Sequence, residues 1–156
     1  MGIEMINLKT KIHDLELISL KQIKDDRGAV YHFLKSTDST FKGFGEAYYS
    51  KINPEVIKGW KLHHRLCQNF CVPIGAVKIV VYDDRDESPT KGELDEIILN
   101  DSNNYCLLSM PAGLWYSFKC ISEDFALLAN IIDQLHDPLE SITLPLENNI
   151  IQYEWK

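Results

Sequence analysis

The chain has 156 residues, of which 45% are hydrophobic and 25% are charged. This composition predicts one folded domain, 1–156, with a substantial core, rather than a disordered chain. The formal net charge of −7 disfavours a general nucleic-acid binder, because such proteins are usually basic. A few local cations still suffice to hold an anionic ligand within an acidic protein.

The N-terminal 22 residues alternate apolar and polar side chains and lack the continuous apolar core of a signal peptide. No window approaches the ~20 apolar residues of a membrane-spanning helix. The four cysteines are Cys67, Cys71, Cys106 and Cys120, and they lack the paired spacing of a zinc ribbon. We therefore expect reduced, mostly buried thiols, a cytoplasmic location and no membrane contact.

Short β-rich runs separated by turn signals follow one another along the chain. We expect strands over 15–20, 29–36, 45–52, 57–64, 69–75, 76–83, 95–101, 105–111, 115–121 and 125–132. Turn sequences such as KDDRG, PIGA and DDRDESPTKG lie between them. Short strands at a spacing of roughly ten residues predict an all-β sandwich or barrel. The tail is irregular, and we expect its Tyr153 and Trp155 to fold back on a sheet or to contact a second subunit.

The stretch GWKLHHR, residues 59–65, places two histidines beside a tryptophan and three cations. Successive side chains of a strand point to opposite faces, so His63 and His64 cannot enter one site together. The same alternation puts Lys61 on the face of His63, and Trp60 on the opposite face. A face with cations and one imidazole suits an anionic substrate.

Two segments have the layout of the paired motifs of a cupin jelly roll, a hairpin that carries histidines and a later Pro-x-Gly turn that enters a strand. Metal-binding cupins use an HxH pair, a glutamate and a histidine after that turn. Here the histidines are adjacent, and the later position in PAGLWY holds Tyr116. Because a transition metal needs three or more convergent ligands, we expect a cupin jelly roll with neither metal nor cofactor.

From about residue 25 to residue 155 the chain resembles the dTDP-4-dehydrorhamnose 3,5-epimerase family of metal-free cupins, which act on nucleotide-linked keto sugars. The segments that carry the resemblance are DDRGAVY, GEAYYSKINPEVIKGWKLHH, GAVKIVVYDDRDESPTKGE, MPAGLWYSF, HDPLE and IQYEW. The resemblance implies an isomerase that acts on a dTDP-4-keto-6-deoxyhexose, in the synthesis of a surface polysaccharide such as O-antigen or capsule. It also implies a homodimer that exchanges an N-terminal strand, here LELISLKQI.

The resemblance further implies roles for individual residues. Arg27 of the DDRG motif would bind the diphosphate, and Lys58 or Lys61 would supply a second cation. His63 would be the base, because neutral imidazole has a pKa near ~6.5. Base attack next to the 4-keto group gives an enolate, and reprotonation from the opposite face inverts the carbon.

Several further residues are assigned around this chemistry. We expect Asp84, or its neighbour Asp83, to orient His63, and Lys61 or Lys78 to stabilise the enolate oxygen. Trp60 and Trp115 are either core aromatics or platforms for the sugar or the base. Tyr48 and Tyr49 are neighbours on one strand, so only one of them can line the barrel.

Two positions depart from the family pattern. The usual catalytic tyrosine falls near Asn130, and the histidine of the second motif falls at Tyr116, which we expect to act as the acid instead. These changes favour a single epimerisation, a keto-isomerisation or a specialised relative over an identical activity. The alternative is a non-catalytic cupin that binds a sugar nucleotide or a partner protein. Convergence of Lys61, His63 and Tyr116 in one barrel, with Arg27 at its mouth, would favour the enzyme.

Overall fold

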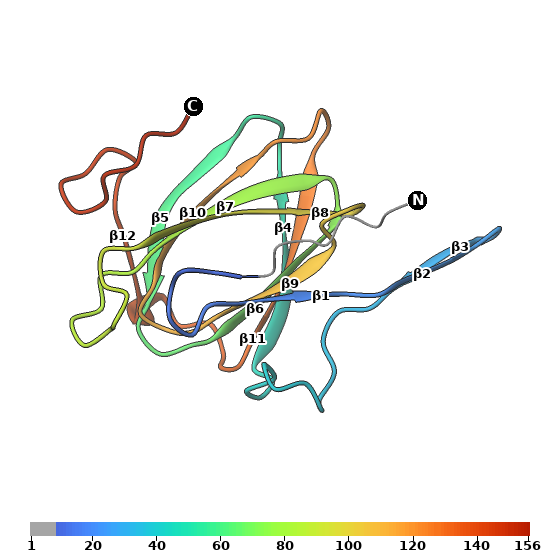
Figure 1. The fold of residues 1–156 in the computed structure, drawn as a ribbon, viewed down its shortest axis with the longest axis horizontal. Helices are drawn as coiled ribbons and strands as arrows, with labels where there is room; N and C mark the ends of the chain where they lie inside the picture. The colour runs from blue at the N-terminus through green and yellow to red at the C-terminus, as the bar shows by residue number, and fades with distance from the viewer. Residues whose placement is uncertain (1–8) are drawn as a thin grey trace.

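A computed structural model describes residues 9–156 of the protein (Figure 1). The prediction that the N-terminus lacks a signal peptide falls partly on residues 1–8, which lie outside the described residues. The described chain forms two five-stranded antiparallel sheets that pack face to face, and a separate two-stranded hairpin. The predicted all-β class is therefore confirmed.

The strands are β1 (Glu16–Ser19), β2 (Gln22–Asp25), β3 (Gly28–Tyr31), β4 (Glu46–Ile52), β5 (Ile57–His63), β6 (Gln68–Ile74), β7 (Ala76–Tyr82), β8 (Leu94–Asn100), β9 (Cys106–Met110), β10 (Trp115–Cys120), β11 (Ala126–Ile132) and β12 (Ser141–Thr143). A single 3-10 turn in the described chain, η1 (Pro138–Glu140), precedes β12. The first sheet has the order β1-β9-β6-β11-β4, and the second has the order β12-β5-β10-β7-β8.

The main core fills the space between the two sheets. Strand β7 shows how it is built, because Val77, Ile79 and Val81 point into this core while Lys78 and Val80 face outward. This alternation is the period of two expected of a strand in a sandwich. Part of the outer face of the second sheet is itself covered, so β7 reads as a nearly continuous apolar run.

The cover on that outer face is the C-terminal tail. Trp60, Trp115 and Ile151 belong to a second apolar cluster, which we call the tail cluster, and Tyr153 and Trp155 pack against it. The tail is fastened by polar contacts as well. The Tyr153 hydroxyl donates to Glu96 at 2.6 Å, and Trp155 Nε1 donates to Ser117 Oγ at 3.1 Å. Of the two expectations for these aromatics, the structure shows folding back on the sheet.

A β-bulge interrupts the pairing of β5 with β10. Lys61 lies opposite Tyr116 and Lys58 opposite Phe118, so Gly59 and Trp60 share the single partner Ser117. An extra residue in one strand shifts the alternation of its side chains by one position. Lys58 and Lys61 therefore face the same side of the sheet, although three residues separate them.

The β2–β3 hairpin extends away from the sandwich (Figure 1). It carries Arg27 at its tip, and its apolar side chains Ile23 and Val30 are 57% and 61% exposed. A two-stranded hairpin on its own is marginally stable in water, and exposed apolar side chains of this kind are typical of interaction surfaces.

The tail cluster predicts a difference between two neighbouring isoleucines. Ile151→Ala removes a side chain that is 2% exposed, and we expect it to lower the free energy of unfolding by about 2–5 kcal/mol. The matched control Ile150→Ala alters a side chain that is 43% exposed, and the change should stay within about 0.5 kcal/mol. Denaturant unfolding measures both. Equal losses would show that the tail does not pack as described.

Candidate active site

A cavity of about 230 Å³ lies between the two sheets near β4 and β5. One wall comes from the first sheet and the other from the second. The first wall consists of Tyr48, Ser50, Phe70, Leu128 and Asn130, and the second of Lys58, Gly59, Lys61, Tyr116, Phe118 and Thr143. Aromatic and apolar side chains with a few convergent polar groups are typical of a small-molecule site.

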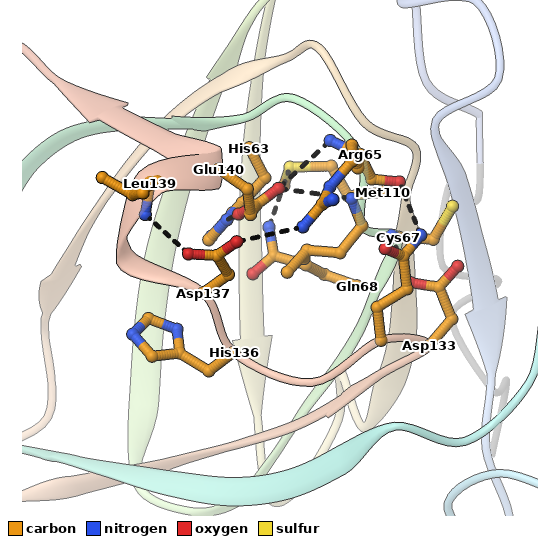
Figure 2. A network of polar contacts seen from close by, with 12 residues as sticks. His63, Arg65, Cys67, Gln68, Met110, Asp133, His136, Asp137, Leu139 and Glu140 are labelled. Carbon is orange, nitrogen blue, oxygen red and sulfur yellow. Dashed lines mark hydrogen bonds and ion pairs between the residues drawn. The ribbon is translucent and has the colours of Figure 1, made fainter.

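At the end of β5, His63 is 2% exposed and its Nδ1 contacts the carboxylate of Glu140, which is 5% exposed (Figure 2). The carboxylate also accepts from the backbone N–H groups of Arg65 at 3.1 Å and Leu66 at 3.4 Å. A buried carboxylate with several donors remains ionised at little cost. Glu140 therefore holds the proton on Nδ1 of His63 and leaves Nε2 as an acceptor.

Local structure explains why Glu140 lies at this place. Asp137 caps the η1 turn by accepting from the Leu139 N–H at 3.0 Å, and Pro138 suits the first position of the turn. The turn leads into β12, where Ser141 pairs with His63. The N–H of His64 then donates to the Glu140 carbonyl at 2.9 Å, which locks the turn to the end of β5.

The acceptor nitrogen of His63 meets a tyrosine. The Tyr116 hydroxyl lies 3.2 Å from Nε2 and 3.4 Å from Oε1 of Gln68. That amide oxygen also accepts from Asn130 Nδ2 at 3.1 Å, and the same Nδ2 lies 3.2 Å from the Tyr48 hydroxyl. A continuous polar network therefore crosses from one sheet to the other along one side of the cavity.

The titration properties of these groups suit acid–base chemistry. Burial lowers the pKa of His63, and the hydrogen bond and charge of Glu140 oppose this shift without reversing it. Burial works against ionisation of Glu140, but the hydrogen bonds from His63 and the backbone outweigh it and hold its pKa below the usual value. Burial raises the pKa of Tyr116 well above its usual range. At neutral pH the site thus holds a neutral imidazole, a carboxylate and a protonated phenol.

The carboxylate that orients His63 was predicted wrongly as Asp84 or Asp83. Asp83 is fully buried and accepts hydrogen bonds from Arg85, Ser88 and Thr90, which stabilise the loop after β7. The Asp84 position belongs to the same loop. The residue that contacts His63 is Glu140, which lies in the segment HDPLE.

Three other assigned residues lie outside the cavity. Trp60 and Trp115 belong to the tail cluster on the outer face of the second sheet, because strand alternation turns them away from Lys61 and Tyr116. They are core aromatics and cannot act as substrate platforms. Lys78 is on that outer face too, 3.1 Å from Glu96, so it cannot stabilise an enolate in the cavity.

Arg27 is also remote from the cavity of its own chain. Its guanidinium forms an ion pair with Asp25 at 2.6 Å at the exposed tip of the hairpin. Lys58, Lys61, Tyr116 and Asn130 do line the cavity, and His63 lies directly behind Tyr116. Gln68 was not predicted, because nothing in the sequence distinguishes a glutamine that is buried at the start of a strand from one that is exposed.

Within residues 9–156, no three His, Cys, Asp or Glu side chains gather to form a metal site. The four cysteines, all of them described, are free thiols. No helix in the described part of the chain is long and apolar enough to cross a membrane.

Comparison with known proteins identifies the family. Residues 9–156 match the sequence family described as dTDP-4-dehydrorhamnose 3,5-epimerase. The chain belongs to this family. Membership confirms the predicted cupin jelly roll and the predicted class of enzyme, an isomerase that epimerises nucleotide-linked sugars for glycan synthesis. It gives no support to a non-catalytic cupin.

Individual known proteins are similar to this chain over most of their length. A crystal structure of a dTDP sugar isomerase from Desulfovibrio desulfuricans is 37% identical with a TM-score of 0.89, and the alignment covers 92% of each chain. The probable low-salt glycan biosynthesis epimerase Agl13 of Haloferax volcanii is 33% identical over 128 residues, 81% of each chain. The spore coat polysaccharide biosynthesis protein SpsL of Bacillus subtilis is 26% identical over 146 residues, which cover 92% of this chain and 96% of SpsL.

The contact between Glu140 and His63 predicts how a variant should behave. Glu140→Gln removes the charge and lets the amide donate to Nδ1, which moves the proton of His63 to Nε2. We expect kcat/KM to fall by on the order of 10²–10⁴-fold. Because Glu140 raises the pKa of His63, its loss should also move the acid limb of the pH profile to lower pH.

Asp84→Asn is the control for this variant, because Asp84 is the carboxylate that the sequence favoured. Its kcat/KM and pH profile should match those of the unmodified protein. The assignment of Glu140 is wrong if Asp84→Asn shows the larger loss or the shifted acid limb.

Proposed function

We propose that the protein epimerises a dTDP-4-keto-6-deoxyhexose at a carbon next to the keto group, with His63 as the base. The observation that carries this proposal is the buried pair of His63 and Glu140. The second ring nitrogen of His63, Nε2, contacts the hydroxyl of Tyr116, which lines the cavity. A base held neutral by burial and oriented by a carboxylate is the arrangement that general-base catalysis needs. Glu140 is a positioning residue, because it acts through His63.

The cations beside the base suit the rest of the substrate. Lys61 and Lys58 line the cavity on the wall that carries His63. We assign Lys61 to the enolate oxygen and Lys58 to the phosphates. The cavity is smaller than the ~300–1,000 Å³ of typical ligand pockets, which fits a sugar ring inside with the nucleotide outside.

Proton removal proceeds on the wall of the second sheet. The Tyr116 hydroxyl passes its proton to Nε2 of His63 as its oxygen takes the proton from the sugar carbon. The electron pair of the broken C–H bond moves onto the keto oxygen, which becomes an enolate beside Lys61. Tyr116 is thus a relay for the base, rather than the acid expected from the sequence, because it contacts His63 directly.

The proposal includes a homodimer in which Arg27 reaches the substrate of the partner subunit. The β2–β3 hairpin projects away from its own cavity and carries exposed apolar side chains, which supports an exchanged position on a second copy. Arg27 would exchange its exposed ion pair with Asp25 for the diphosphate. A nucleotide-sugar substrate and four free thiols support a cytoplasmic location.

Solvent exchange tests the base. The protein is incubated with dTDP-4-keto-6-deoxyglucose in deuterated water, and the sugar protons are followed by NMR. We expect deuterium to enter at C3 or C5, and His63→Ala to abolish this exchange. The adjacent, exposed His64→Ala is the control and should exchange normally. Absence of exchange in the unmodified protein, or full exchange in His63→Ala, would overturn the proposed function.

Mixed dimers test the role of Arg27. We expect Arg27→Ala to raise KM by roughly 10–100-fold, from the loss of charged hydrogen bonds, and Lys24→Ala in the same hairpin to have no effect. Co-expression of Arg27→Ala with His63→Ala chains, carrying different tags, gives dimers in which one site has both residues. These dimers should be active at low substrate, whereas either parent is not. Inactive mixed dimers would show that Arg27 does not act across subunits.

A further inference from the structure

Inversion at carbon requires a proton donor on the face opposite the base. The need for such a donor in this protein rests on the proposed function. The base and its relay, His63 and Tyr116, belong to the second sheet. The donor must therefore come from the wall formed by the first sheet. The polar side chains of that wall are those of Tyr48, Ser50 and Asn130. An amide is a poor acid, and an aliphatic hydroxyl is a far weaker acid than a phenol, whose pKa is near ~10.

Tyr48 and Asn130 are direct cross-strand partners in the pairing of β4 with β11. Their side chains lie on the same face of the sheet and both line the cavity. Tyr49, the next residue of β4, points the other way and is 68% exposed. A phenol thus stands beside the amide on the wall that faces the base.

The hydrogen bonds of Asn130 define what the Tyr48 hydroxyl can do. The two hydrogens on Nδ2 of Asn130 are used by Gln68 at 3.1 Å and by the oxygen of Tyr48 at 3.2 Å. The Tyr48 oxygen is therefore an acceptor in this contact, and its own hydrogen has no acceptor among the residues that the structure describes. In a wall of the cavity, a phenolic hydrogen in this state is available to a bound sugar.

The amide is held in this orientation at a cost. Asn130 Oδ1 is buried and has no hydrogen-bond partner within residues 9–156. Leaving a buried acceptor unpaired is unfavourable, so the contacts of the Asn130 amino group must hold the amide in this orientation. The Gln68 carbonyl fixes the Asn130 amino group in place, and that amino group in turn fixes the Tyr48 oxygen.

We infer that Tyr48 is the catalytic acid that protonates the enolate from the wall opposite His63, and that Asn130 positions it. The O–H bond of Tyr48 breaks as a new C–H bond forms at the inverted carbon, and the enolate electron pair supplies that bond. The keto group is restored, and Tyr48 is left as a phenolate while His63 is protonated. Return of one proton from His63 to solvent and of one from solvent to Tyr48 closes the cycle without any other reactant.

The surroundings of Tyr48 keep it protonated before the reaction. Burial raises its pKa, the hydrogen bond from Asn130 partly opposes the shift, and the charges of Glu46 and Glu140 add to it. The Asn130 contact also stabilises the phenolate that forms, because an N–H donor favours the anion.

The ratio of inversion to exchange tests the inference. In deuterated water, Tyr48→Phe should still exchange the sugar proton through His63, with retention of configuration. Formation of the epimer should fall by roughly 10²–10⁴-fold, the usual contribution of a general acid. Asn130→Ala should change the same ratio in the same direction, whereas the exposed control Tyr49→Phe should leave it unchanged. Thermal unfolding confirms that each variant is folded.

Other outcomes separate the two proposals. Normal epimer formation by Tyr48→Phe would overturn the role of Tyr48 and leave His63 as the base. Equal loss of exchange and inversion in Tyr48→Phe would also overturn it, because a residue that only packs or binds affects both alike. Absence of deuterium exchange in the unmodified protein would overturn the proposed function, and the assignment of Tyr48 with it.

Discussion

The structure of the site depends on keeping one carboxylate charged inside the protein. An unpaired buried charge costs several kcal/mol or more, so Glu140 needs every donor around it. Those donors are the His63 ring and the backbone at the end of β5. These hydrogen bonds to Glu140 together fix the position of the η1 turn, the pairing of β12 with β5 and the orientation of the His63 ring. The base is therefore positioned by two segments that are far apart in the sequence, the end of β5 and the continuous stretch of η1 and β12.

The same requirement spreads into the rest of the interior. Once His63 must present Nε2 inward, a hydroxyl is needed to meet it, and Tyr116 supplies one from the neighbouring strand. Gln68 and Asn130 extend the satisfied polar groups to the opposite sheet. The polar network and the apolar core both lie between the sheets. The cavity is the part of this space where side chains leave room for a ligand beside the polar network.

Most of the fold was readable from the sequence, because its signals are local. Alternation and turn residues located nearly all strands of the two sheets to within a residue or two. The short strands β2 and β12 were missed, because part of β2 lies in KDDRG, which predicts a turn, and β12 lies in the tail, whose sequence is irregular. Parity along β5 also placed His63 and Lys61 on the inner face. The partner of His63 could not be found this way, because Glu140 is 77 residues distant and is brought in by strand pairing. Sequence proximity to a hairpin end favoured Asp84 instead.

The bulge in β5 has a consequence for how such proteins diversify. With regular pairing, Lys58 would share the face of Trp60, and the cavity would lose one of its two cations. One inserted residue thus changes the charge of the cavity by turning Lys58 into it, without the substitution of any side chain. Insertions and deletions in this strand are therefore a route to new ligand preference that residue-by-residue comparison of relatives overlooks, and a library for redesign should vary strand length there as well as side chains.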